Sequence, residues 1–156
     1  MKYRVLTSEE LSYFDEDFKH FLIVNGIHAE AWLELNKDEP QKAQQLIELF
    51  SDTILQKVYE KISFLEFRSP DSCMVFQFKS DLIELITIQK KENSSADLSR
   101  PESIHAAFIN NADDLTFFKS SKTHAGMREQ EIHRMIEQGC VISTAEFWNS
   151  LSEALQ

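Results

Sequence analysis

The stretch FLEFRSPDSCMVFQFKSDLIELITIQ, residues 64–89, decides the fold, because its apolar residues alternate instead of recurring every three to four positions. Three runs within it are rich in β-branched and aromatic residues: Phe64–Arg68, Cys73–Lys79 and Leu82–Gln89. The connections between the runs are short and have turn composition, which favours antiparallel neighbours. The stretch therefore predicts a three-stranded antiparallel meander.

The residues before this stretch follow a helical period and predict three helices. The first begins at the capping box Thr7–Glu10, carries a phenylalanine-rich stripe and stops at Asn25–Gly26. A short second helix covers residues 29–36. The third begins near Pro40, where proline is tolerated in a first helical turn, and continues to about Ile62.

The residues after the stretch predict a loop and a helical hairpin. Residues 90–100 are polar and predict a mobile loop. Within Pro101–Thr123, the apolar clusters fit either short helices or an added strand. A helix from Met127 to Gln138 and a last helix opened by the capping box Ser143–Glu146 form the hairpin, which we expect to pack on the sheet. The chain thus predicts a single α+β domain over residues 1–156.

The third predicted strand is apolar on both faces. Alternation places Leu82, Ile86 and Ile88 on one face, and Ile83 and Leu85 on the other. The second face therefore needs cover, which we expect from the C-terminal helices, with a second copy of the chain in a homodimer as the alternative.

Composition and charge limit the classes of partner. The 156 residues have a formal net charge of −10, and nucleic-acid affinity comes mainly from basic residues that neutralise phosphates. We therefore expect neither nucleic acid nor a membrane as partner. The two cysteines and an N-terminal segment without an apolar core predict a cytoplasmic protein.

Motifs for common cofactors and catalytic centres are absent from the sequence. The glycines, Gly26, Gly126 and Gly139, lie far apart, whereas phosphate-binding loops need clustered glycines. The chain also has no HExxH, CxxC, EF-hand loop or nucleophile elbow. We accordingly predict no cofactor, no metal and no catalytic residue.

The stretch EQEIHRMIEQGC, residues 129–140, offers a set of metal-ligand types on one helix. Glu129, His133 and Glu137 are four residues apart. A metal site generally needs ligands from several elements, and Glu–His pairs at this spacing also arise as surface charge pairs. We keep these three as binding candidates without assigning a metal, and interpret Cys140 as a small buried residue.

Glu66 and Arg68 form a second candidate pair, because alternation places both on one face of the first strand. A solvated sheet face is the simpler interpretation. The functional alternative is a guanidinium fork that binds a carboxylate or phosphate. Cys73 lies within a Met-Val-Phe context that is typical of a core.

Three segments, IELFSD (47–52), FLEFRSP (64–70) and MIEQGCVIS (135–143), resemble a family of short, uncharacterised bacterial proteins. The resemblance covers most of the chain and implies a free-standing bacterial cytoplasmic domain, with no activity or ligand attached. Our expectation is a non-enzymatic, acidic protein-interaction domain. The alternative is a small enzyme or a ligand- or metal-binding protein with a pocket near Arg68 or His133.

Overall fold

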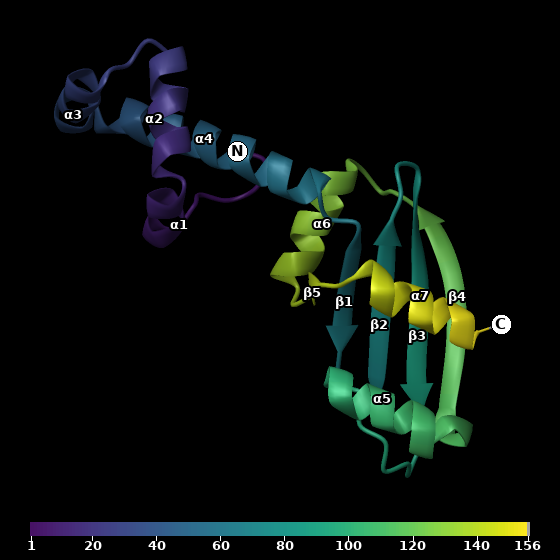
Figure 1. Cartoon of the computed structure of the whole chain (residues 1–156). Helices are drawn as coiled ribbons and strands as arrows, with labels where there is room; N and C mark the ends of the chain where they lie inside the picture. Colours follow the sequence, from purple (N-terminus) through teal and green to yellow (C-terminus); the bar gives the residue numbers. More distant parts are fainter. Residues whose placement is uncertain (156) are drawn as a thin grey trace. The chain divides into compact units, whose positions relative to one another are not determined.

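The computed structural model describes residues 1–155, and the chain divides into two units (Figure 1). The first unit, Met1–Tyr59, contains four helices. The helices are α1 (Ser8–Tyr13), α2 (Asp15–Val24), α3 (Ala29–Asp38) and α4 (Pro40–Glu60). The capping box at Thr7 is confirmed, and Gly26 ends α2 with a φ of 78°. The first predicted helix is in fact two helices, since the chain bends at Phe14 and restarts with three acidic residues that favour a helix N-terminus.

The core of this first unit is aromatic. The buried ring of Phe50 in α4 lies 4.9 Å from the ring of Phe18 and 5.4 Å from that of Phe21, both in α2. The N-terminal segment is tied to α4, because the amides of Lys2 and Tyr3 donate to the Asp52 carboxylate at 2.7 and 3.0 Å. The segment and the helices thus share one core.

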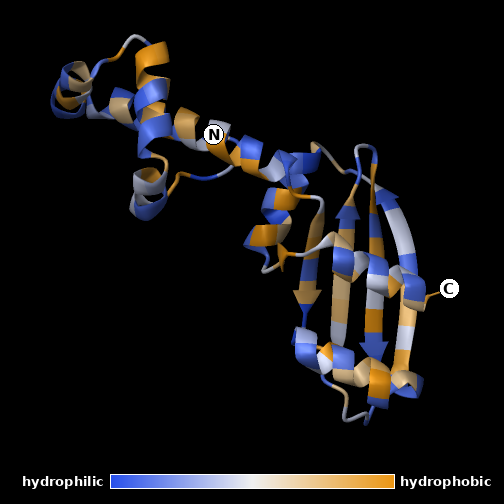
Figure 2. Ribbon diagram, viewed as in Figure 1, coloured by the Kyte–Doolittle hydropathy of each residue, from blue (hydrophilic) through white to orange (hydrophobic). Residues whose placement is uncertain are grey.

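The second unit, which begins at Glu60, contains an antiparallel sheet of five strands rather than three. The strand order is β4-β3-β2-β1-β5, with bounds β1 (Phe64–Arg68), β2 (Ser72–Phe78), β3 (Leu82–Lys90), β4 (Leu115–Thr123) and β5 (Val141–Ile142). The predicted meander is confirmed as β1–β3. Periodicity left β4 undecided between a short helix and an added strand, because its second half is polar at the sheet edge (Figure 2). It missed β5 because two residues carry no period.

The helices of this unit also differ in detail from the prediction. They are α5 (Pro101–Asn110), α6 (Arg128–Glu137) and α7 (Ala145–Ala154), with a 3₁₀ turn at Ala112–Asp114. Strand β5 separates α6 from α7, so the predicted hairpin is interrupted. Helix α7 is capped by Thr144 rather than Ser143, because the Ser143 amide instead donates to Phe64 O at 3.0 Å and belongs to the sheet.

Helices α5 and α7 cover one face of the sheet (Figure 1). Ile86 and Ile88 of β3 are fully buried there in a cluster with Trp148 and Leu151 of α7. Helix α6 is held to the last residue of β2 by Arg128, which donates to Phe78 O at 3.2 Å. On the opposite face of β3, Ile83 is buried and Leu85 is only half-buried, so this second face is partly covered within the unit.

Residues 91–100 contain no helix or strand, and their mobility stays a prediction. Two apolar residues of this segment, Ala96 and Leu98, are buried in the same cluster as Ile86, which the sequence analysis did not predict. The Leu98 amide donates to Pro70 O at 3.1 Å. None of the helices within residues 1–155 is long and apolar enough to cross a membrane.

Candidate functional site

Two of the hollows, one in each unit, are candidates for a functional site. The hollow in the second unit forms around β1, where Glu66 and Arg68 point to the same face of the sheet. In the register, Arg68 lies opposite Cys73, and Glu66 lies opposite Val75 on one side and Val141 on the other. The alternation of β1 therefore brings a carboxylate and a guanidinium together beside a buried thiol.

Glu66 and Arg68 form an ion pair in which Arg68 Nε donates to Glu66 Oε2. The side chains are 7% and 16% exposed, respectively. The Arg68 guanidinium also lies over the Phe147 ring, with Cζ 5.2 Å from the ring centroid. These contacts fix one edge and one face of the guanidinium, and within residues 1–155 no nitrogen or oxygen acceptor meets Nη1 or Nη2.

A cavity of ≈ 460 Å³ adjoins this ion pair and is lined by Glu66, Arg68, Ser99, Pro101, Gly139 and Val141. Gly139 has a φ of 110°, and an added Cβ would lie 3.3 Å from Phe67, so this rim position requires glycine. At the Ser99 side, the hydroxyl and amide of Ser99 donate to Asp97 and lower the pKa of its carboxyl group. The cavity thus combines one cation, nearby carboxylates and an apolar wall.

The thiols do not have the properties of nucleophiles. Cys73 is fully buried, and burial raises its pKa to about 12, against the opposing effect of Arg68. Burial also raises the pKa of Cys140. Both thiols are free, and both are held in the neutral form at physiological pH.

The three candidates on α6 are not brought into a ligand cluster. Glu129 forms an ion pair with Arg128, with 3.5 Å between Nη1 and Oε1. His133 is half-buried and has an interaction of its own, and Glu137 is exposed. In the part of the chain that the structure describes, no group of three or more His, Cys, Asp and Glu side chains could hold a metal.

The buried acid of α6 is Glu131, which the sequence analysis missed. Its side chain is 3% exposed and accepts a hydrogen bond from the Ala125 amide. Its Oε2 lies 3.9 Å from Nδ1 of His124, whose side chain is 8% exposed, and neither atom has a hydrogen-bond partner. Glu131 is four residues from both Met127 and Met135, which places it on the same helix face as these apolar residues. This spacing could have indicated from the sequence that Glu131 is buried.

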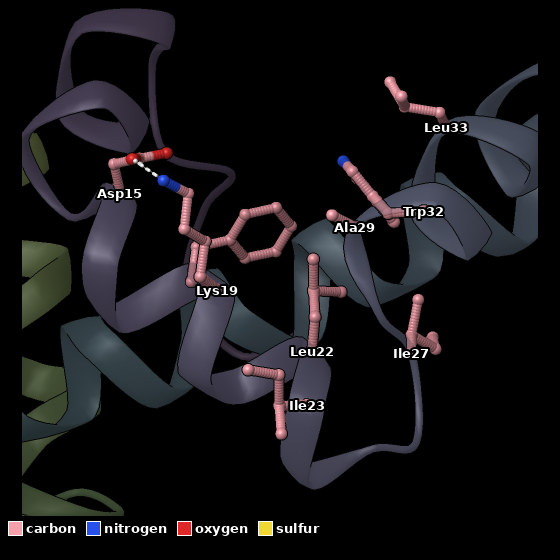
Figure 3. Close-up of a pocket in the computed structure, with 9 residues that line it drawn as sticks. Asp15, Lys19, Leu22, Ile23, Ile27, Ala29, Trp32 and Leu33 are labelled. Carbon is pink, nitrogen blue, oxygen red and sulfur yellow. Dashed lines mark ion pairs between the residues drawn. The ribbon is translucent and has the colours of Figure 1, made fainter.

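The hollow in the first unit is an apolar groove between α2 and α3 (Figure 3). We call it the α2–α3 groove; it measures ≈ 360 Å³ and is lined by Asp15, Phe18, Lys19, Leu22, Ile23, Ile27, Ala29, Trp32 and Leu33. The rings of Phe18 and Trp32 meet edge to face at 5.2 Å. Ile23 and Leu33 are 54% and 70% exposed, so large apolar side chains flank the groove in contact with solvent.

Charged residues surround the α2–α3 groove. Lys19 Nζ lies 3.0 Å from Asp15 Oδ2 at the rim, as Figure 3 shows. Between Asp15 and Asp38 the chain has six acidic and two basic residues. The groove lining is therefore apolar apart from one ion pair, and the helices that form the groove carry a net negative charge. The sequence analysis assigned its phenylalanine stripe to the core and did not predict a groove.

Comparison with known proteins identifies the family. A family model described as "Family of unknown function (DUF6495)" matches residues 1–156, and the chain belongs to this family. The resemblance to an uncharacterised family is thereby confirmed. Neither the curated proteins nor the solved structures contain a significant match.

Proposed function

Because the family has no known activity, we propose from the geometry that the chain is a non-enzymatic protein-interaction domain whose α2–α3 groove binds a basic amphipathic helix of a partner protein. The observation that carries the proposal is the pairing of solvent-exposed Ile23 and Leu33 with an aromatic groove floor of Phe18 and Trp32. Exposed apolar side chains gathered around a concavity are typical of binding surfaces.

A helix is the occupant that the groove supports best. Residues 1–59 contain helices and no strand, so no open strand edge is offered for main-chain pairing with an extended peptide. Recognition must therefore use side chains, as when an amphipathic helix places its apolar face in a groove. Helices α2 and α3, which form the groove, carry six acidic and two basic residues, and this excess of negative charge favours lysine and arginine on the polar face of the bound helix.

The proposal is tested with a 14-residue leucine–lysine helical peptide as probe, and a peptide of the same pattern with glutamate for lysine. Trp32 fluorescence in a Trp148→Phe background reports binding, because Trp32 lines the groove. We expect saturable binding of the lysine peptide. Leu33→Ser and Ile23→Ser should each weaken it at least about tenfold, since burial of one such side chain contributes roughly 1.5–3 kcal/mol.

Matched controls lie on the same unit. Val24 is 71% exposed and Leu49 is 53% exposed, and neither lines the groove. Val24→Ser and Leu49→Ser should leave peptide affinity within about twofold of the wild type. Equal weakening by the control variants, or equal affinity for the glutamate peptide, would overturn the proposal.

The proposed setting is a bacterial cytoplasm, with a protein partner and no nucleic acid or membrane. The two free, buried thiols support a reducing compartment, and the net charge of −10 supports the exclusion of nucleic acid. A homodimer is the alternative partner, and the oligomeric state is tested below with the second face of β3.

A further inference from the structure

We infer that the cavity beside Arg68 is a binding site for a monocarboxylate with a short apolar tail, independent of the α2–α3 groove. The inference starts from the fixed guanidinium. Arg68 is 16% exposed, is held at Nε by Glu66 and lies over the Phe147 ring. Its position is thus set before any ligand arrives, which lowers the entropy cost of binding.

The remaining donors of Arg68 define the ligand chemistry. A guanidinium has five N–H donors, and the bond to Glu66 uses the one on Nε. Nη1 and Nη2 have no nitrogen or oxygen acceptor within residues 1–155, and the side chain lines a cavity of ≈ 460 Å³. Arg68 also hydrogen-bonds to the Cys73 thiol, but each Nη atom carries two N–H groups, so donors remain for a ligand. Two parallel donors at a cavity wall match the two oxygens of a carboxylate.

Charge favours a single negative charge on the ligand. Glu66 already compensates Arg68, and the low-pKa carboxylate of Asp97 is bound to Ser99 at the rim. A dianion such as phosphate would bring two negative charges close to Glu66 and Asp97, whereas a monocarboxylate brings one and meets less repulsion. Pro101 and Val141 supply apolar surface for a short tail, and the volume lies in the usual range of small-molecule sites.

The carboxylate can belong to a free small acid or to the C-terminus of a polypeptide, because the two share the group that Arg68 recognises. Two-dimensional ¹H–¹⁵N NMR titration of the full chain distinguishes them. The probes are sodium butyrate, butyramide, acetyl-glycyl-valine and its C-terminal amide. Sodium chloride matched in ionic strength and inorganic phosphate complete the set.

We expect butyrate and the peptide acid, but neither amide, to shift the backbone amides of Arg68, Ser99 and Val141 in a saturable way. Tighter binding of the peptide acid assigns the site to polypeptide C-termini, and tighter binding of butyrate assigns it to small acids. Either result supports the inference. Equal shifts with butyramide or chloride, or tighter binding of phosphate than of both acids, would overturn it.

Three substitutions should change the affinity for butyrate in three different ways. Arg68→Lys, which loses the planar fork, should weaken butyrate at least about tenfold. Glu66→Gln, which keeps the acceptor for Nε and removes the competing charge, should tighten butyrate at least about threefold. Arg134→Lys, the same exchange at an arginine outside the cavity lining, serves as control and should leave affinity unchanged.

Val141 supplies a test that leaves the ion pair intact, should Arg68→Lys fail to fold. Its side chain is 59% exposed and lies opposite Glu66 in the register. Val141→Glu places a carboxylate within reach of Arg68 and should abolish butyrate binding, whereas Val141→Gln has nearly the same size and should retain it. Equal butyrate affinity in Val141→Glu and Val141→Gln would overturn the inference.

Discussion

Exchange of Glu131 for glutamine should be nearly neutral, whereas its truncation to alanine should be costly. In the structure, His124 Nε2 donates to Lys79 O at 2.8 Å, because a carbonyl oxygen can only accept. Nδ1 of the same ring faces Glu131 Oε2, 3.9 Å away, and neither atom has a hydrogen-bond partner. A glutamine amide in place of Oε2 would donate to Nδ1 and satisfy both positions.

The magnitudes follow from the contacts. Glu131→Ala loses the bond from the Ala125 amide to a buried carboxylate, worth about 1.5–3 kcal/mol, and leaves that amide unpaired. The ion pair with Arg134, whose side chain is 56% exposed, adds less than about 1 kcal/mol. We expect Glu131→Ala to lower the free energy of unfolding by about 2–4 kcal/mol. Glu131→Gln should stay within about 1 kcal/mol of the wild type, since a new hydrogen bond of about 0.5–1.5 kcal/mol offsets the lost charge.

The assay is urea unfolding followed by Trp148 fluorescence in a Trp32→Phe background. Trp148 is buried in the cluster between the sheet and α7, so it reports the unit that contains Glu131. Glu129→Gln is the matched control, because Glu129 lies on the same helix and its Oε1 is 3.5 Å from Arg128 Nη1. Glutamine keeps an oxygen acceptor for this contact, so the exchange should cost less than about 1 kcal/mol. A Glu131→Gln variant as unstable as Glu131→Ala would refute the reasoning and show that the buried charge itself holds the helix.

Three further predictions concern a thiol, a sheet face and a loop. Cys73 should not react with a thiol-specific disulfide reagent at pH 8 until urea unfolds the chain. Its folded pKa of about 12 exceeds the unfolded value of about 8.5, so its contribution to stability should also fall as pH rises between these values. Leu85→Lys should stay folded, since Leu85 is half-buried beside a cavity of ≈ 250 Å³. Light scattering should give a monomer for both the wild type and the variant. A dimeric wild type and a monomeric variant would instead place this face at a subunit interface. Limited proteolysis should cut first within residues 91–94, and protection of the Glu92 and Asn93 amides in hydrogen exchange would contradict the predicted mobility. The Leu98 amide donates to Pro70 O and belongs to a buried residue, so it should be protected.

The elements predicted correctly from the sequence are those in which apolar residues repeat with a regular period along the element itself. The long helix α4 and strands β1–β3 repeat their apolar residues over whole elements, so periodicity alone located them. Strand β4 was left between two alternatives because Lys119 to Thr123 are exposed and polar at the edge. The restart at Phe14 was hidden because helical spacing continues through it. In each missed case, tertiary contacts or an edge position decided the structure.

The same distinction holds for the candidate sites. Alternation was sufficient to place Glu66 and Arg68 on one face, because a strand fixes that relation over two residues. It could not supply Ser99 and Gly139, which line the cavity from two other segments, or Phe147, whose ring lies under the Arg68 guanidinium. On α6, the sequence drew attention to Glu129, His133 and Glu137 by their spacing. Burial instead selected Glu131, which contacts the segment just before the helix at His124 and Ala125.

The edges of the sheet bear on the homodimer alternative. One edge strand, β5, has only two residues, and the other, β4, carries Lys119 and Lys122 in its exposed half. Short edges and edge lysines both oppose pairing with another sheet, because a second chain would have to desolvate the ammonium groups for few backbone hydrogen bonds. The open part of the sheet is instead a face, with Leu85 and Phe76 half-buried and Phe118 53% exposed. A dimer of this chain would therefore have to form face to face, and a Leu85→Lys exchange acts on that arrangement without touching either edge.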